Sequence, residues 1–179
     1  MKVLALIFDG FEEEEATAPF ALLRRAKISL DIASNKTLVT GSHNIIIKSD
    51  ISDFTKIDYK NYDCLLIPGG AHYKFIRTNN DVLTILKYFM DNNKYVALIC
   101  AAPTLLGEMG YLKGRNYTCF TSMNSDFAGT YIDKKVVVDG KLITSRSVAA
   151  ALDFAYTIIE NLAGKETLDL VKKQIYYEE

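Results

Sequence analysis

Residues 95–103 read YVALICAAP, a run of five apolar side chains followed by a cysteine, two alanines and a proline. A short continuous apolar run is typical of a strand that is buried on both faces of a sheet. Small residues and Pro103 directly after it favour the start of a helix. The spacing therefore predicts a strand that turns sharply into a helix at Cys100, which is the geometry of a nucleophile elbow.

The rest of the chain repeats this alternation of buried strands and helices. Further strands are predicted over residues 2–8, 28–33, 45–48 and 63–67, and a hairpin with an Asp-Gly turn over residues 136–144. Helices are predicted over residues 12–26, 81–92, 103–109, 147–162 and 165–173. We therefore expect residues 1–179 to form a single α/β domain, a sandwich with a mostly parallel central sheet covered on both sides.

The charges of the chain almost cancel. Lys and Arg number 21 against 22 for Asp and Glu, which gives a formal net charge of -1 over 179 residues. Such a balance, without long basic runs, argues against nucleic acid or an anionic membrane as a partner. No segment approaches the roughly 18 consecutive apolar residues that a membrane-spanning helix needs. We therefore expect a partner that is neither nucleic acid nor membrane.

Cysteine usage favours a reducing compartment. The chain has three cysteines, Cys64, Cys100 and Cys119. Three is too few and an odd number for a disulfide framework, and no two of them form a CxxC pair. Reduced thiols fit a cytosol best. The apolar run at the N-terminus stops at Phe8, before acidic residues, which is unlike a secretory signal peptide. We therefore expect a cytoplasmic location.

Ligands of open α/β sheets bind beyond the carboxyl ends of the strands, where Cys100 is expected. Cys100 is either a nucleophile, with a thiolate stabilised by free amides at a helix N-terminus, or a buried structural cysteine. Gly69 and Gly70 follow another strand and form either an ordinary turn or a place where amides approach a substrate. Cys64 and Cys119 are expected to be core or near-site packing.

Few side chains can serve Cys100 as a base. The chain has two histidines; His72 either reaches the pocket or lies on a surface loop, and His43 lies in a polar turn where exposure is expected. A glutamate is the other candidate, because a protonated carboxyl can donate a hydrogen bond to a thiolate without repelling it. The glutamates of residues 12–15 are by default a solvated helix start, and only one or two of them can face the strand ends.

The sequence implies neither a metal nor a cofactor. Cys100 has no ligand partners at the spacing of a metal site, and no Gly-rich phosphate motif such as GxGxxG occurs.

Five segments, in this order and spacing, resemble the ThiJ/PfpI superfamily, in the branch of the parkinsonism-associated deglycase and the bacterial YajL-type proteins. They are residues 10–15 with Pro19 and Arg24-Arg25-Ala26, 66–70, 97–103, 139–146 and 162–165. The likeness covers essentially the whole chain. It implies a flavodoxin-like three-layer sandwich and a homodimer.

The resemblance also implies residue roles. It places the family's reactive elbow cysteine at Cys100 and its partner glutamate at Glu15, whose carboxyl would hydrogen-bond the sulfur. The oxyanion amides would come from Gly70 and Ala101. Further candidates for the pocket are Gly69, His72 and Phe120.

Departures from the family pattern narrow the activity. Related proteases have a histidine directly after the cysteine, where this chain has Ala101, and no histidine follows Cys100. Protease and glutamine amidotransferase activities are therefore disfavoured. Phe120 stands where the human member of the branch has a histidine near the site, and His43 stands where that member has an arginine from its dimer partner.

The resemblance implies a cysteine-dependent, cofactor-independent glyoxalase or protein deglycase. Its substrates would be methylglyoxal-type dicarbonyls or glycated proteins, in defence against carbonyl and oxidative stress. The alternative is a redox-sensing or chaperone-like stress protein, whose cysteine oxidises and which turns over little substrate.

Overall fold

The computed structural model describes residues 1–177, which are built around a six-stranded sheet. Its strands are β1 (Lys2–Leu6), β2 (Ser29–Ala33), β5 (Cys64–Ile67), β6 (Tyr95–Ile99), β9 (Val136–Asp139) and β10 (Leu142–Ser145). They are ordered β2-β1-β5-β6-β10-β9, and all neighbours pair in parallel except β10 and β9. Two small sheets pair β3 (Leu38–Thr40) with β4 (Ile46–Lys48) and β7 (Asn116–Tyr117) with β8 (Thr130–Tyr131).

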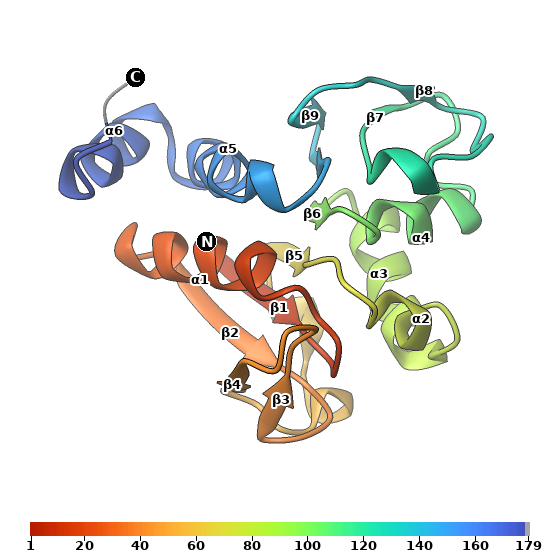
Figure 1. The fold of residues 1–179 in the computed structure, drawn as a ribbon, viewed down its shortest axis with the longest axis horizontal. Coiled ribbons are helices and arrows are strands. Elements are labelled where there is room, and N and C mark those ends of the chain that lie inside the picture. Colours follow the sequence, from red (N-terminus) through yellow and green to blue (C-terminus); the bar gives the residue numbers. More distant parts are fainter. Residues whose placement is uncertain (178–179) are drawn as a thin grey trace.

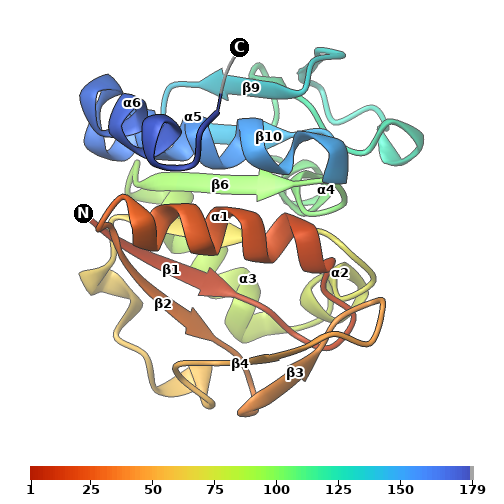
Figure 2. The ribbon, with the colours of Figure 1, turned by 60° about the vertical axis from the view of Figure 1, so that its left-hand side comes forward.

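Helices cover both faces of the sheet (Figure 1). They are α1 (Glu13–Arg25), α2 (Tyr73–Ile76), α3 (Asn80–Asp91), α4 (Pro103–Glu108), α5 (Ala151–Ala163) and α6 (Lys165–Gln174). Short 3₁₀ turns occupy Phe54–Lys56, Tyr59–Asn61, Thr121–Met123 and Val148–Ala150. Figure 2 shows α1, α5 and α6 on the near side of the sheet and α3 behind it.

The sheet divides the core into two apolar layers. Along β1, Val3 and Ala5 belong to the layer under α1 and α5, whereas Leu4 and Leu6 belong to the layer on the opposite face. Successive strand residues point to opposite faces, so a strand buried on both faces needs apolar residues at every position. This explains the continuous apolar runs in the sequence.

The predicted α/β sandwich with a mostly parallel sheet is confirmed. The strand at 95–99 and the hairpin around Asp139-Gly140 are found where they were predicted. β3 and the short α2 were not predicted, and α5 begins at Ala151 because a 3₁₀ turn occupies the positions before it. In the portion of the chain that the structure describes, we find no helix with the length and apolarity to cross a bilayer.

Candidate active site at the ends of the strands

Cys100 lies between the end of β6 and the start of α4, in a strained turn. Its φ of 64° is in the left-handed region, where the Cβ of an ordinary residue crowds the backbone. Neighbouring segments hold the turn: the Cys100 amide donates to the carbonyl of Ser145 at 2.9 Å, and the Cys100 carbonyl accepts from the amide of Phe120 at 2.8 Å. Cys100 thus has the backbone geometry of a nucleophile elbow.

Gly69 and Gly70 follow β5 and lie against the elbow. A Cβ built on Gly69 would be 2.5 Å from the Cβ of Cys100 and 2.4 Å from Oε2 of Glu15. Gly70 has a φ of 97°, and a Cβ there would be 2.4 Å from the amide nitrogen of Glu12. Glycine at these positions therefore lets the backbone approach both the cysteine and the start of α1.

Glu15 lies in the first turn of α1 and is 1% exposed. Its Oε2 accepts a hydrogen bond from the amide of Gly69 at 2.9 Å. The same carboxyl shares a hydrogen bond with the thiol of Cys100. The structure therefore brings together Glu15, Cys100 and Gly69 from three segments that are far apart in sequence.

The surroundings of Glu15 favour its protonated form. Burial raises the pKa of its carboxyl from 4.5 to about 7. The hydrogen bonds from Cys100 and from the Gly69 amide act against this rise, whereas the nearby Glu12 carboxylate adds to it. A carboxyl with a pKa near neutrality can both donate and accept a proton in a reaction.

The sulfur of Cys100 is held by opposing influences. Burial raises the pKa of the thiol, and the neighbouring Glu15 carboxylate raises it further, whereas hydrogen bonds from the amides of Ala101 and Gly70 lower it. The two amides that were expected to form an oxyanion hole therefore both face the sulfur. The pair shares its protons, so that one group ionises near neutral pH while the other stays protonated.

The thiol therefore differs from the expected one, which was to be acidified by the N-terminus of a helix. The helix after it, α4, has only six residues, and Cys100 is partly buried beside an acid. The state with an ionised sulfur requires that Glu15 keep its proton.

His72 is 2% exposed and lies between two loops. Its Nδ1 accepts from the amide of Phe8 at 3.2 Å, and its Nε2 donates to the carbonyl of Pro68 at 2.8 Å. Burial lowers the pKa of His72 to about 4, which keeps the ring neutral. Both ring nitrogens are thus used to join the loops after β1 and β5, and neither is left to act as a base for Cys100.

Glu13 is the residue that the sequence did not single out. It was expected among the solvated glutamates, but it is 3% exposed. Its Oε2 lies 2.9 Å from Nδ1 of His43, and its Oε1 accepts from the amides of His43 and Ile45. Glu13 therefore fastens the turn between β3 and β4 to the start of α1. His43 is exposed, as expected, and its side chain remains 72% accessible.

Glu12, Glu13 and His43 place three potential metal-ligand atoms within 4.8 Å of one another. Two of these groups already bind each other, and Glu12 uses Oε2 to accept from the amide of Glu15 at 2.8 Å. The internal hydrogen bonds explain this cluster as part of the fold. The three-residue spacing of Glu12 and Glu15 is a signal that could have indicated this cap in the sequence, but the sequence analysis did not use it.

The remaining candidates lie around the elbow or in the core. Phe120 is 42% exposed, and its backbone is tied to Cys100 as described above. Cys119 is buried next to it, and Cys64 is buried inside β5. Burial raises the pKa of Cys119 to about 11 and raises that of Cys64 as well, so neither thiol is suited to ionise.

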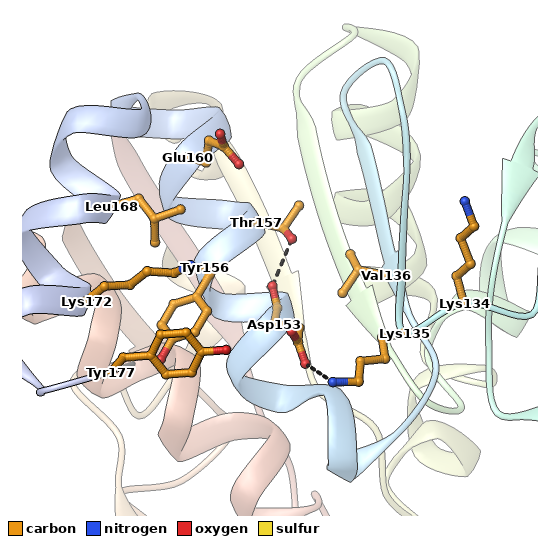
Figure 3. Close-up of a pocket in the computed structure, with 10 residues that line it drawn as sticks. All are labelled: Lys134, Lys135, Val136, Asp153, Tyr156, Thr157, Glu160, Leu168, Lys172 and Tyr177. Carbon is orange, nitrogen blue, oxygen red and sulfur yellow. Dashed lines mark hydrogen bonds and ion pairs between the residues drawn. The ribbon is translucent and has the colours of Figure 1, made fainter. Parts of the chain in front are cut away.

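A separate pocket of about 490 Å³ lies between α5, α6 and the residues before β9 (Figure 3). Within it, Lys135 pairs with Asp153 at 3.0 Å, and the rings of Tyr156 and Tyr177 meet edge to face with centroids 5.2 Å apart. Cys100 and the residues beside its sulfur, Glu15, Gly70 and Ala101, are not among the residues that line this pocket.

Comparison with known proteins agrees with the geometry. Residues 1–161 match the model of the DJ-1/PfpI family. Deglycase TK1284 of Thermococcus kodakarensis is 35% identical over 150 residues, which cover 82% of this chain and 90% of that protein. Protein DJ-1 homolog B of Arabidopsis thaliana is 34% identical over 170 residues; the match covers 92% of this chain but spans only 39% of that longer relative.

The fold is also shared with solved structures. The structure of oxidized Toxoplasma gondii DJ-1 superimposes with a TM-score of 0.89 at 28% identity, and the match covers 99% of each chain. The sequence motifs, the flavodoxin-like fold and these matches agree with the resemblance found in the sequence. The chain therefore belongs to the DJ-1/PfpI family.

Proposed function

We propose that this chain is a cysteine-dependent, cofactor-independent glyoxalase or deglycase that acts on methylglyoxal-type dicarbonyls or their early protein adducts. The observation that carries the proposal is the convergence on one sulfur of a proton-bearing acid, Glu15, and two backbone donors, the amides of Gly70 and Ala101. Similar proteins of Thermococcus kodakarensis and Pyrococcus furiosus are named deglycases, which supports the same substrate class.

The first step is addition of the sulfur to an aldehyde. The Glu15 carboxylate takes the proton of the Cys100 thiol, and the resulting thiolate attacks C1 of methylglyoxal, so that a carbon–sulfur bond forms and the electron pair of the carbonyl moves to its oxygen. The amides of Gly70 and Ala101 stabilise the developing negative charge. Glu15 then gives its proton to that oxygen, which leaves a hemithioacetal and a carboxylate.

The second step is a proton shift within the adduct. The Glu15 carboxylate removes the hydrogen of C1 and returns it to the oxygen on C2, which forms an enediol. Return of the remaining hydroxyl proton to C2 gives a lactate thioester. Water then cleaves the carbon–sulfur bond, so that methylglyoxal and one water yield lactic acid and the free thiol.

Replacement of the sulfur tests this proposal most directly. Cys100→Ala should abolish conversion of methylglyoxal to lactate while the circular dichroism spectrum stays unchanged. Cys64→Ala, which removes a buried thiol inside β5, is the matched control and should retain turnover. Glu15→Gln should lower kcat by about a hundredfold, because it removes the proton shuttle. Full turnover by Cys100→Ala would end the proposal.

A redox-sensing role is the second candidate, because the same sulfur is the one to oxidise and the similar DJ-1 of Toxoplasma gondii was solved in an oxidized form. In this role the thiolate of Cys100 is oxidised by peroxide to a sulfenate and then a sulfinate, each step transferring one oxygen and releasing water. A neutral Glu15 would donate a hydrogen bond to the sulfinate. Intact mass after mild peroxide should then show a gain of two oxygens confined to Cys100, and scattered oxidation would count against the role.

The homodimer, the cytoplasmic location and a chaperone-like role stay predictions. Three exposed apolar side chains on or next to the β3–β4 hairpin, Leu38, Ile45 and Ile46, offer a surface that a second copy can cover. Sedimentation equilibrium should give twice the mass of the chain, and a monomer at micromolar concentration would contradict the dimer.

A further inference from the structure

Three hydrogen bonds join Glu12, Glu15 and Gly69 in a closed ring. The amide of Glu12 donates to the carbonyl of Gly69 at 2.9 Å, and the amide of Gly69 donates to Oε2 of Glu15 at 2.9 Å. The amide of Glu15 in turn donates to Oε2 of Glu12 at 2.8 Å. Each residue gives one donor and one acceptor, so every bond fixes the geometry of the next.

The ring connects the start of α1 to the loop after β5. Glu12 is the N-cap of α1, with an extended backbone, and its side chain satisfies an amide that the helix leaves unpaired. Gly69 is in turn pressed against Cys100, as the space around its Cα shows. A displacement of Glu12 should therefore also displace the Glu15 carboxyl and Gly69, which lies against Cys100.

We propose that Glu12 is a positioning residue for the reactive pair, because its carboxylate holds the Glu15 carboxyl on the Gly69 amide beside Cys100. The proposal rests on the proposed function for its chemical meaning, but the ring itself is independent of any substrate. The hydrogen bond between the two residues joins the Glu12 carboxylate to the backbone amide of Glu15, so Glu12 acts through Glu15 and not on the sulfur.

Glu12 has an electrostatic effect as well as a geometric one. Its negative charge is among the causes that raise the pKa of Glu15. The charged groups facing Glu12 are His43, whose Nδ1 lies 3.8 Å from Oε1, and the Glu13 carboxylate that binds the same ring nitrogen. The groups facing Glu15 are the Cys100 thiol and Glu12 itself. A neutral side chain at position 12 should therefore make the pair lose its first proton at lower pH.

The test measures alkylation of Cys100 by iodoacetamide as a function of pH, followed by peptide mass mapping. Glu12→Gln keeps an oxygen that can accept from the Glu15 amide but removes the charge, and it should lower the midpoint by about half a pH unit. Glu12→Ala opens the ring and should slow alkylation at pH 7 by about tenfold. Glu14→Gln is the matched control, because it removes a charge from the exposed neighbour and should leave the midpoint in place.

The outcomes separate the inference from the proposed function. A residue that only caps the helix would lower Tm in Glu12→Ala but leave both the alkylation rate of Glu12→Ala and the midpoint of Glu12→Gln unchanged, which would overturn the inference, as would an equal shift in Glu14→Gln. If Cys100 of the wild-type chain resists alkylation, the shift is read from the ¹³C resonance of the Glu15 carboxyl with the same criteria. Absence of methylglyoxal turnover in the wild-type chain would end the proposed function without affecting this result.

Discussion

Glu13 and Glu15 lie two positions apart at the start of α1, and both are buried, but their surroundings shift their pKa values in opposite directions. Burial acts to raise both values. At Glu13 the hydrogen bonds from the His43 side chain and from backbone amides outweigh burial, so the pKa is lowered. At Glu15 burial prevails, and the pKa rises to about 7.

The difference teaches that the partners of a buried carboxyl decide its charge. Glu13 faces the turn between β3 and β4, which supplies a histidine and two amides. Glu15 faces the ends of β5 and β6, which supply one amide and a thiol that has its own proton to lose. One region uses its glutamate as a fixed anion that fastens the fold, and the other keeps its glutamate ready to exchange a proton.

Each carboxyl is also seated against a glycine. A Cβ on Gly41 would be 2.3 Å from Oε1 of Glu13, and a Cβ on Gly69 would be 2.4 Å from Oε2 of Glu15. The surroundings of Glu13 and Glu15 thus share a glycine packed against the carboxyl group, and they differ in the groups that donate hydrogen bonds to it. This parallel allows matched substitutions on the two sides.

The largest effect on stability is expected from Glu13→Ala. The change leaves His43 without its partner and two backbone amides, in partly buried hydrogen bonds, without an acceptor, which should lower the free energy of unfolding by about 3 kcal/mol. Urea unfolding at pH 7 measures the effect. Glu14→Ala, on the exposed side of the same turn, should change stability by less than about 0.5 kcal/mol. Equal losses in the two variants would contradict a special role for Glu13.

The next effect is the pH dependence of stability, which should have opposite signs for the two glutamates. The folded chain holds a proton on Glu15 up to about pH 7, whereas the unfolded chain loses it near 4.5. The stabilisation is therefore complete below pH 4.5 and is lost as pH rises to 7, by at most about 3 kcal/mol. Glu13 has a lowered pKa, so its contribution is present above pH 4.5 and is lost as the pH falls through its folded value.

Urea unfolding between pH 3 and pH 8 separates these contributions. Glu15→Gln should flatten the curve between pH 4.5 and 7 and leave the acid limb unchanged. Glu13→Gln should do the reverse. A wild-type curve that keeps its shape in both variants would mean that other groups set the pH dependence.

Paired glycine substitutions sharpen the comparison further. Gly41→Ala and Gly69→Ala each force a methyl group against a fixed carboxylate and should each cost about 2 kcal/mol of stability. Only Gly69→Ala should also slow alkylation of Cys100, because only that methyl group displaces the reactive pair. Similar alkylation rates in the two variants would show that the Glu15 side tolerates the shift.

The smallest effect is expected from His43→Gln. Glu13 raises the pKa of His43, so the stabilisation from their pairing is complete below pH 6.5 and is lost as pH rises through the folded pKa of the ring. Because the ring is exposed and screened by water, Tm should fall by only about 2 °C at pH 5.5, and the two chains should converge at pH 9. A larger loss at pH 9 than at pH 5.5 would reverse the assigned sign.

Much of the fold could be predicted because it depends on local patterns. The apolar run at 95–99 is a strand within its predicted bounds, and Asp139-Gly140 turns a hairpin where this dipeptide indicates one. The limits of α1 differ from the prediction by one residue at each end. These features depend on neighbours in the chain, which a single sequence displays.

The site was predicted less completely, because tertiary contacts decide which side chains face inward. Four successive glutamates occupy residues 12–15. Their order alone does not show that Glu13 fixes the turn between β3 and β4 while Glu15 exchanges a proton. Glu13 is buried because the turn between β3 and β4 packs over it, and β3 itself was not predicted. His72 is likewise held by the amide of Phe8 and the carbonyl of Pro68, which no local spacing indicates.

The left-handed backbone at Cys100 has a consequence for the early stages of unfolding. A residue other than glycine keeps such a conformation only while its surroundings impose it. Here two hydrogen bonds impose it, one to Ser145 at the end of β10 and one to Phe120. Heat or mild denaturant that breaks either hydrogen bond should let the backbone of residue 100 leave the left-handed region. The sulfur would then move away from Glu15 and from the amides of Gly70 and Ala101. The reactivity of the Cys100 thiol should therefore be lost at a lower temperature or denaturant concentration than the helical structure.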